Sequence, residues 1–259
     1  MTAPQHERST QERFLEIIRG QLAGLRDKVE HALSEETFTK ELRSLEGDPV
    51  YSNLGFASPE YALVRLVGRI SISIGRRLGE LYDKFPRFVA AARFGIPVDE
   101  ISPKVGALLL DIAIPRERLS IADLRHVENE LKARGLRLGA RGVGIEVRYN
   151  FNPNDSARLR KDDTMAANLR HSGYTPIYLV FSSISPREEA MKRLSRAGWF
   201  LITGAEARAF ANDLFQLNIE AIMAEPSVDA EIRRDVAALM SQLASSYAFR
   251  AVTKPDVKT

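Results

Sequence analysis

The 259-residue sequence contains no cysteine, which excludes disulfides, thiolate metal sites and a cysteine nucleophile. It has no run of about 20 apolar residues, the length that a membrane span needs, and its first residues lack the apolar core of a signal peptide. The four histidines are far apart, and no P-loop, GxSxG, HExxH or GxGxxG motif is present. We therefore expect a soluble cytoplasmic protein that is not a P-loop ATPase, a zinc protease or a dinucleotide-binding enzyme.

Arginine is the abundant basic residue. It supplies 28 of the 37 basic side chains, against 9 lysines, while the net charge is only +3. Because arginine binds phosphates and guanine edges with two parallel hydrogen bonds, this composition is compatible with nucleic-acid binding. The codon bias of a GC-rich genome explains it equally well.

The pattern of apolar residues divides the chain into a helical first part and an alternating second part. Helical spacing predicts helices at 9–33, 34–46 and 58–83, with a loop at 50–57. The continuous apolar run 105–114 is typical of a buried strand, and more strands are expected at 143–151, 177–181 and 199–202, with helices between and after them. The expected fold is α/β with a helical N-terminal part. We expect a helical N-terminal region at 1–100, the α/β core at 101–220, and a C-terminal helix and tail at 221–259.

Acidic residues are the remaining candidates for chemistry. Asp111 interrupts the apolar run, where an unpaired acid costs several kcal/mol. Glu146 and Arg148 lie on one face of the next strand, because side chains two residues apart share a face. Two carboxylates with a neighbouring cation are suited to holding Mg²⁺ against a phosphodiester. Glu80, in the helix 58–83, is the candidate for a third acid.

Each of these residues also has an ordinary structural interpretation. Glu146 and Arg148 fit the polar face of a solvated strand. Asp111 fits a cap at the end of a strand, and Glu80 fits a solvated helix position.

The second part of the chain resembles the PD-(D/E)xK restriction endonucleases, in particular the ApaLI-like family. Three segments carry the resemblance, 144–160 (GIEVRYNFNPNDSARLR), 176–181 (PIYLVF) and 197–207 (AGWFLITGAEA), within a stretch of about residues 100–217. The resemblance implies a restriction-endonuclease-like core, with a mixed sheet flanked by helices. It also implies Asp111 and Glu146 as metal-binding acids, Arg148 in the position of the motif's lysine, and Glu80 as the helix acid.

This chain departs from that family pattern at one position, where Glu-Val-Arg replaces Glu-x-Lys. A guanidinium stays protonated, so Arg148 can stabilise negative charge or orient a water but cannot act as a base. The helix expected at 119–134 separates Asp111 from Glu146 in sequence. Either that helix is an insertion or the first acid lies elsewhere, for example at Glu128 or Glu130.

Candidate phosphate contacts follow the strand that carries Glu146. Basic and amide side chains at the start of the next helix are placed to hold a DNA backbone, although an ordinary capped helix start has the same composition. The candidates are Asn152, Arg158, Arg160 and Lys161, together with Arg76 and Arg77 of the earlier helix.

The predicted function is a Mg²⁺-dependent, site-specific endodeoxyribonuclease of the type II restriction class. A palindromic target predicts a homodimer, and the resemblance implies a cognate DNA methyltransferase in the host. Two alternatives stay open: a catalytically weak or inactive nuclease-fold protein that binds DNA, and a structural interaction module.

Overall fold

The computed structural model describes residues 3–149, 156–182 and 188–253, and these divide into two compact units. The first unit combines the start of the chain, up to Phe14, with Gly79–Ile222. The second combines Leu15–Leu78 with the segment that begins at Met223. The expected boundary at 220 lies close to one of these divisions, whereas the one at 100 does not, because the second segment of the first unit begins at Gly79, within a long helix.

The elements alternate between helix and strand only in the first unit. The described helices are α1 (Ala3–Ala32), α2 (Glu35–Glu46), α3 (Pro49–Asn53), α4 (Pro59–Phe94), α5 (Ile121–Lys132), α6 (Ser156–His171), α7 (Glu188–Ala197), α8 (Gly204–Phe215), α9 (Ile219–Ala224), α10 (Pro226–Ala244) and α11 (Tyr247–Thr253), with a 3-10 turn, η1, at Arg116–Arg118. The described strands are β1 (Lys104–Val105), β2 (Leu108–Leu109), β3 (Ile112–Pro115), β4 (Gly142–Arg148), β5 (Tyr174–Val180) and β6 (Phe200–Thr203).

Four of these strands form a mixed sheet in the order β3-β4-β5-β6. Strand β3 is antiparallel to β4, whereas β4, β5 and β6 are parallel to one another. Helix α6 connects β4 to β5, as parallel neighbours require. Strands β1 and β2 form a separate two-stranded hairpin. The structure therefore has the expected α/β class, with a small mixed sheet flanked by helices.

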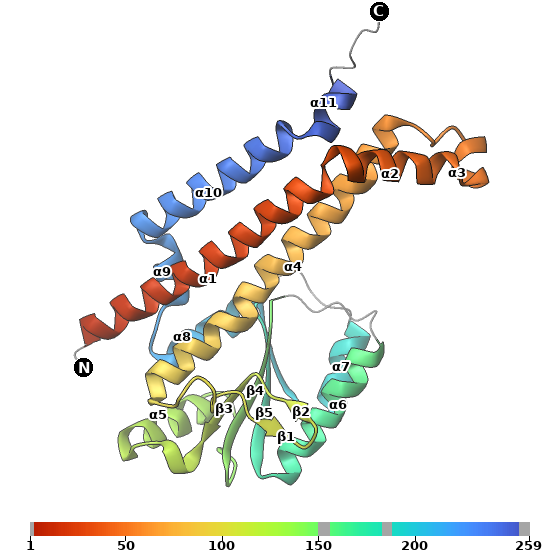
Figure 1. Cartoon of the computed structure of the whole chain (residues 1–259). Coiled ribbons are helices and arrows are strands. Elements are labelled where there is room, and N and C mark those ends of the chain that lie inside the picture. The colour runs from red at the N-terminus through yellow and green to blue at the C-terminus, as the bar shows by residue number, and fades with distance from the viewer. Residues whose placement is uncertain (1–2, 150–155, 183–187, 254–259) are drawn as a thin grey trace, which may run out of the picture. The chain divides into compact units, whose positions relative to one another are not determined.

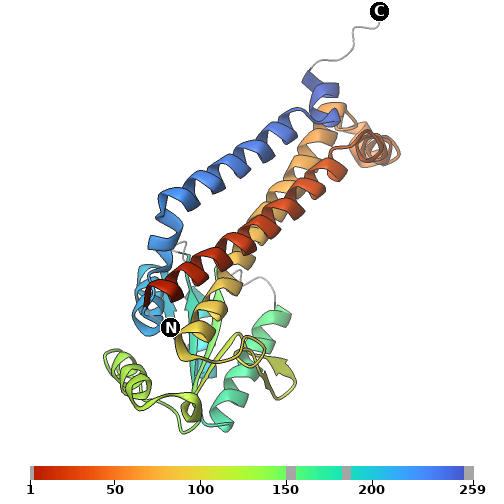
Figure 2. The same ribbon diagram turned by 60° about the vertical axis from the view of Figure 1, so that its left-hand side comes forward.

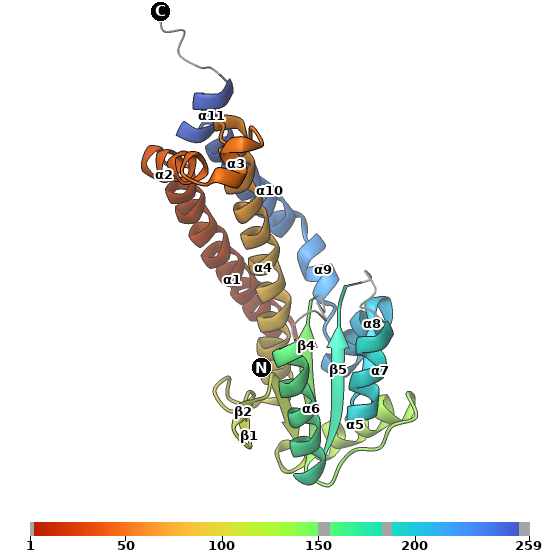
Figure 3. The ribbon, with the colours of Figure 1, turned by 90° about the vertical axis from the view of Figure 1, so that its right-hand side faces the viewer.

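Helices cover both faces of this sheet. Figure 1 shows α6 and α7 on one side of the strands and α5 on the other, and Figure 3 shows α6 lying across β4 and β5. Residues Gly142–Val147 of β4 are consequently all buried, on both faces. The expectation of a solvated polar face is wrong for this strand.

Glycine at position 144 allows α6 to lie directly on the sheet. A Cβ atom at Gly144 would come within 2.4 Å of Leu169 of α6 and 3.3 Å of Leu110. Leu169 belongs to the buried cluster that also includes Tyr178 and Trp199. The close approach fixes the distance between α6 and the strand that carries Glu146.

The second unit is helical. Arg26 of α1 pairs with Asp235 of α10 at 3.2 Å, and Figure 2 shows the two helices running side by side. Glu41 of α2 is buried. Its carboxylate forms ion pairs with Arg65 and Arg69 of α4 (3.0 and 2.8 Å). Ion pairs therefore connect helices that are distant in sequence.

Three of the predicted elements differ from the structure. The run 105–114 forms β1, β2 and the start of β3 rather than one strand, because the backbone turns at Gly106, which has a φ of +64°. The predicted loop 50–57 contains α3, which Asp48 caps by accepting from the Val50 N–H (2.9 Å). Helix α4 continues beyond residue 83, through Pro86, to Phe94.

Candidate functional site

Two carboxylates meet across strands β3 and β4. Asp111 directly precedes β3, and the antiparallel pairing of Ile112 with Ile145 places Asp111 opposite Glu146. Asp111 Oδ2 accepts a hydrogen bond from the Val147 backbone N–H (3.0 Å). Asp111 and Glu146 are only 6% and 4% exposed, so the sheet buries both acids at one place.

Arg148 bridges these two acids. Its Nη1 donates to Asp111 Oδ2 (2.6 Å) and to the Val147 carbonyl (2.6 Å), and its Nη2 donates to Glu146 Oε2 (2.7 Å). Its Nε is buried and has no hydrogen-bond partner in the part of the chain that the structure describes. The guanidinium thus neutralises part of the charge of Asp111 and Glu146 but leaves one of its own donors unsatisfied.

Helix α6 adds a third buried acid, Asp162, which is 4% exposed. Asp162 Oδ2 accepts a hydrogen bond from the Tyr178 hydroxyl (3.0 Å), and its backbone carbonyl accepts one from Trp199 Nε1 (2.9 Å). Its Oδ1 lies 3.9 Å from Arg148 Nη2. The Arg148 guanidinium also lies over the Tyr178 ring, 5.8 Å from its centre. Three buried carboxylates therefore surround one guanidinium.

Helix α4 contributes two further side chains. Arg87 forms an ion pair with Asp111 Oδ1. Asp83, one turn earlier, accepts a hydrogen bond from the Tyr149 backbone N–H (3.0 Å), and its charge interacts with those of Arg148 and Asp111. The C-terminal half of α4 thus supports the beginning of β3, where Asp111 lies, and the end of β4, where Tyr149 lies.

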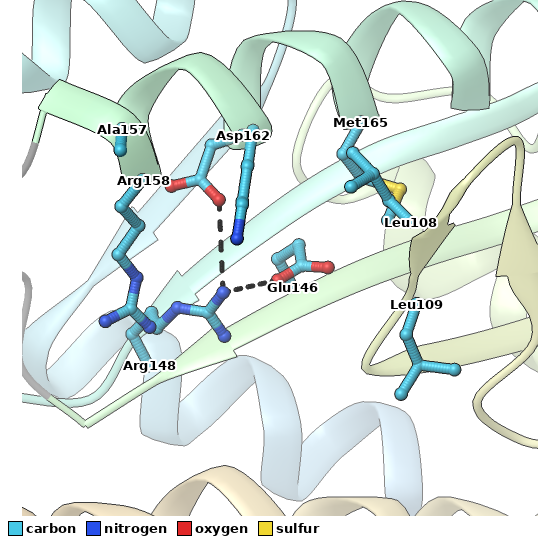
Figure 4. Close-up of a pocket in the computed structure, with 9 residues that line it drawn as sticks. Leu108, Leu109, Glu146, Arg148, Ala157, Arg158, Asp162 and Met165 are labelled. Atoms are coloured by element: carbon cyan, nitrogen blue, oxygen red, sulfur yellow. Dashed lines mark hydrogen bonds and ion pairs between the residues drawn. The ribbon is translucent and has the colours of Figure 1, made fainter.

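A cavity of about 440 Å³ borders this cluster (Figure 4). In the figure, Arg148 extends from β4 between Glu146 and Asp162, while Arg158 approaches from α6. The opposite end is apolar. The lining residues are Leu108, Leu109, Glu146, Arg148, Ala157, Arg158, Lys161, Asp162 and Met165.

Burial shifts the protonation equilibria of the acids. Burial, and then the negative charge of Asp111, hold the pKa of Glu146 well above its usual value, although Arg148 lowers it. Burial also raises the pKa of Asp162 and that of Asp83. For Arg148, burial lowers the pKa, but the surrounding charges of Asp111, Tyr178 and Glu146 raise it above the normal value for a guanidinium. The arginine stays charged, whereas Glu146, Asp162 and Asp83 bind protons more readily than exposed carboxyl groups do.

The donor set suits a hard divalent cation. No group of three or more His, Asp and Glu side chains is placed to hold a metal within residues 3–149, 156–182 and 188–253. Mg²⁺, however, is commonly held by only one or two carboxylates together with water and substrate phosphate. Asp111 and Glu146 supply such a pair. Burial, and then the charge of Asp111, raise the pKa of Glu146, and a cation between the two acids would relieve the second of these effects.

The structure brings together some of the predicted residues and places others apart. Asp111, Glu146 and Arg148 contact one another, and Arg158 and Lys161 line the same cavity. The alternative first acids lie elsewhere: Glu128 pairs with Arg116 and Glu130 with Arg134. The sheet register therefore favours Asp111.

The remaining candidates do not line the cavity. Glu80 forms an ion pair with Lys84 (3.6 Å), and it is Asp83, on the same helix, whose charge interacts with those of Asp111 and Arg148. Arg160 is exposed on α6. Arg76 and Arg77 belong to the second unit, where Arg77 donates to Gln21 (3.2 Å). Asn152 lies outside the described residues.

Neither Asp162 nor Tyr178 was predicted from the sequence as a site residue, although the sequence pattern marks Asp162. In α6 the buried positions Leu159, Asp162, Ala166 and Leu169 follow helical spacing, so an acid occupies a position on the apolar face. Tyr178 sits inside an apolar strand, where an aromatic residue is ordinary, and nothing in the pattern marks its hydroxyl.

Comparisons with known proteins add nothing to this geometry: no family model, no curated protein and no solved structure matches the chain. None of the described helices is long and apolar enough to cross a membrane.

Proposed function

We propose that the protein is a divalent-metal-dependent endonuclease that hydrolyses phosphodiester bonds in double-stranded DNA at a specific sequence. One observation carries the proposal: the β3–β4 register places Asp111 beside Glu146, with Arg148 two residues further along the same strand. The resemblance of this Glu-x-Arg strand to the PD-(D/E)xK motif supports the same conclusion, with Arg148 in the lysine position.

The cavity supports a phosphodiester as the substrate. Arg158 and Lys161 line it together with Glu146 and Arg148, so two further cationic side chains border the place proposed for the phosphates that flank a scissile bond. Leu108, Leu109 and Met165 form the apolar end, which suits a deoxyribose or base.

The chain's own residues have separate roles in this proposal. A cation held by Asp111 and Glu146 would supply a water of lowered pKa and neutralise the scissile phosphate. Arg148, which cannot act as a base, would stabilise the negative charge that develops on the phosphoryl oxygens. Asp83 and Arg87 hold the ends of β3 and β4 in place. We expect a homodimer to cleave both strands of a palindromic target. A cognate methyltransferase is expected to protect the DNA of the host.

A protein that binds DNA without cutting it is the second candidate. The observation that favours it is the engagement of Arg148 with both Asp111 and Glu146, which occupies the two proposed metal ligands. In such a protein Arg158 and Lys161 would still contact DNA phosphates, and its affinity for DNA would fall as the salt concentration rises.

Incubation of the purified protein with unmethylated phage DNA, in Mg²⁺ and in EDTA, tests the proposal. Discrete fragments are expected in Mg²⁺ and none in EDTA. The Glu146→Gln variant should lose cutting, whereas Glu128→Gln, which changes an exposed acid paired with Arg116, should retain it. Uncut DNA with a salt-sensitive gel shift would favour the second candidate, and neither cutting nor binding would overturn both.

A further inference from the structure

The two proposed metal ligands are both engaged by Arg148. Its Nη1 lies 2.6 Å from Asp111 and its Nη2 lies 2.7 Å from Glu146. A divalent cation at Asp111 Oδ2 and Glu146 Oε2 would compete with this guanidinium for the same two oxygens, since the two positive charges repel each other. Cation binding at these oxygens therefore favours a second position for Arg148.

The present position of Arg148 is incompletely satisfied. Its Nε is buried without a hydrogen-bond partner among the described residues. A buried donor without a partner destabilises the present position and so lowers the cost of leaving it.

Asp162 marks where that position lies. Its Oδ1 is 3.9 Å from Arg148 Nη2, beyond hydrogen-bond distance but within reach of a small change in side-chain torsion. In Figure 4 the same guanidinium nitrogen faces Glu146 on one side and Asp162 on the other. The Tyr178 ring, 5.8 Å from the guanidinium, offers a second favourable contact.

Asp162 is itself held in place. The Tyr178 hydroxyl donates to its Oδ2, and Trp199 Nε1 donates to its backbone carbonyl. All three residues are at most 4% exposed. An anchored carboxylate can accept a moving guanidinium with little loss of conformational entropy.

We propose that Asp162, fixed by Tyr178, is a positioning residue that receives Arg148 when Asp111 and Glu146 bind a divalent cation. This inference rests on the proposed function. It assigns Asp162 an effect on cation affinity that passes through Arg148 rather than through direct ligation.

Calcium titration of the full-length protein without DNA, by isothermal titration calorimetry, tests this in a double-mutant cycle. In the presence of Arg148, Asp162→Asn should weaken Ca²⁺ binding, because the displaced guanidinium has lost its charged acceptor. In an Arg148→Gln background the same substitution should weaken it about tenfold less, since only the direct charge effect remains. Asp163→Asn is the matched control, because Asp163 pairs with Arg193 (2.6 Å) and does not line the cavity.

The outcomes separate the inference from the function on which it rests. Equal effects of Asp162→Asn in both backgrounds would overturn the inference and make Asp162 a direct contributor to the cation site. Absence of Ca²⁺ and Mg²⁺ binding to the unsubstituted protein, both without DNA and with a DNA duplex present, would overturn the proposed metal-dependent function itself.

A second variant keeps every formal charge around the site. Tyr178→Phe removes the hydroxyl that fixes Asp162, and Ca²⁺ affinity should fall about threefold.

The only tryptophan in the sequence, Trp199, contacts both Tyr178 (ring centres 5.3 Å apart) and Asp162, so its fluorescence should change on Ca²⁺ addition. This change should shrink in Asp162→Asn and not in Asp163→Asn. Unaltered affinity in Tyr178→Phe together with an unaltered fluorescence change in Asp162→Asn would contradict the inference.

Discussion

Asp111 and Arg148 are 37 residues apart in sequence and form a 2.6 Å ion pair at the junction of two antiparallel strands. The same Asp111 carboxylate forms an ion pair with Arg87 of α4 and accepts a hydrogen bond from the Val147 backbone. A single acid therefore connects a helix, a strand end and Arg148. Several measurable consequences depend on this connection.

Replacement of Arg148 by lysine tests whether positive charge or guanidinium geometry matters for cleavage. An ammonium group has its three donors on one nitrogen and lacks the planar fork with which the guanidinium reaches Asp111 through Nη1 and Glu146 through Nη2. If Arg148 stabilises developing charge, Arg148→Gln should slow cleavage by about 100-fold or more, and Arg148→Lys should recover part of the loss. Single-turnover rates on a cleaved DNA site measure both, and identical rates in the two variants would argue against a role for charge.

The stability of the metal-free protein should rise as the pH falls through the raised pKa values of its buried acids. Burial raises the pKa of Glu146, Asp162 and Asp83 above their unfolded values, so the folded chain binds protons at pH values where the unfolded chain has released them. Stability contributed in this way is present below the raised pKa values and is lost as the pH rises through them. Urea unfolding in EDTA at several pH values measures the slope, and Glu146→Gln should flatten it. A slope of opposite sign would show that other groups dominate.

Arg158 and Lys161 should contribute to DNA affinity through phosphates rather than through bases. Alanine at each position is expected to weaken binding of all sequences alike and to reduce the slope of log affinity against log salt by about one. Fluorescence anisotropy with a labelled duplex, over a salt series in Ca²⁺, provides this slope. Lys192→Ala is the comparison, because that exposed lysine pairs with Glu188 (2.6 Å) and does not line the cavity. A loss confined to one sequence would instead indicate base contacts.

Gly144→Ala should destabilise the first unit. The added Cβ would lie 2.4 Å from a Leu169 carbon, so α6 or its side chains must shift, at a cost of about 1–3 kcal/mol. Gly20→Ala in α1, where nothing lies within 4 Å of the new atom, is expected to be neutral or stabilising. Thermal or urea unfolding compares the two variants, and equal stabilities would mean that the sheet accommodates the methyl group.

The elements with clear periodicity were predictable, and those without it were not. The predicted helix 119–134 corresponds to α5, and the predicted strand 177–181 overlaps β5 in all but its last residue. The run 105–114 concealed a hairpin, since the turn falls at a single glycine, Gly106, within a largely apolar segment. Pro86 lies inside α4, although proline normally ends a helix.

The candidate site was predictable only where one strand carries it. Glu146 and Arg148 share a strand face, so their contact follows from a two-residue spacing. That Asp111 joins them depends on strand register across an intervening helix, which local sequence does not encode. The contributions of Arg87 and Asp83 depend on the packing of α4, and those positions look like ordinary charged positions of a helix.

The hydrogen bond from Val147 N–H to the Asp111 carboxylate makes a main-chain proton part of the site. Regular pairing between β3 and β4 ends at Ile112 and Ile145, so beyond that point a side chain takes the place of a strand carbonyl. Hydrogen exchange at the Val147 amide therefore reports directly on the state of Asp111. Its exchange rate responds when that carboxylate changes partner, in a protein that needs no label and no substrate.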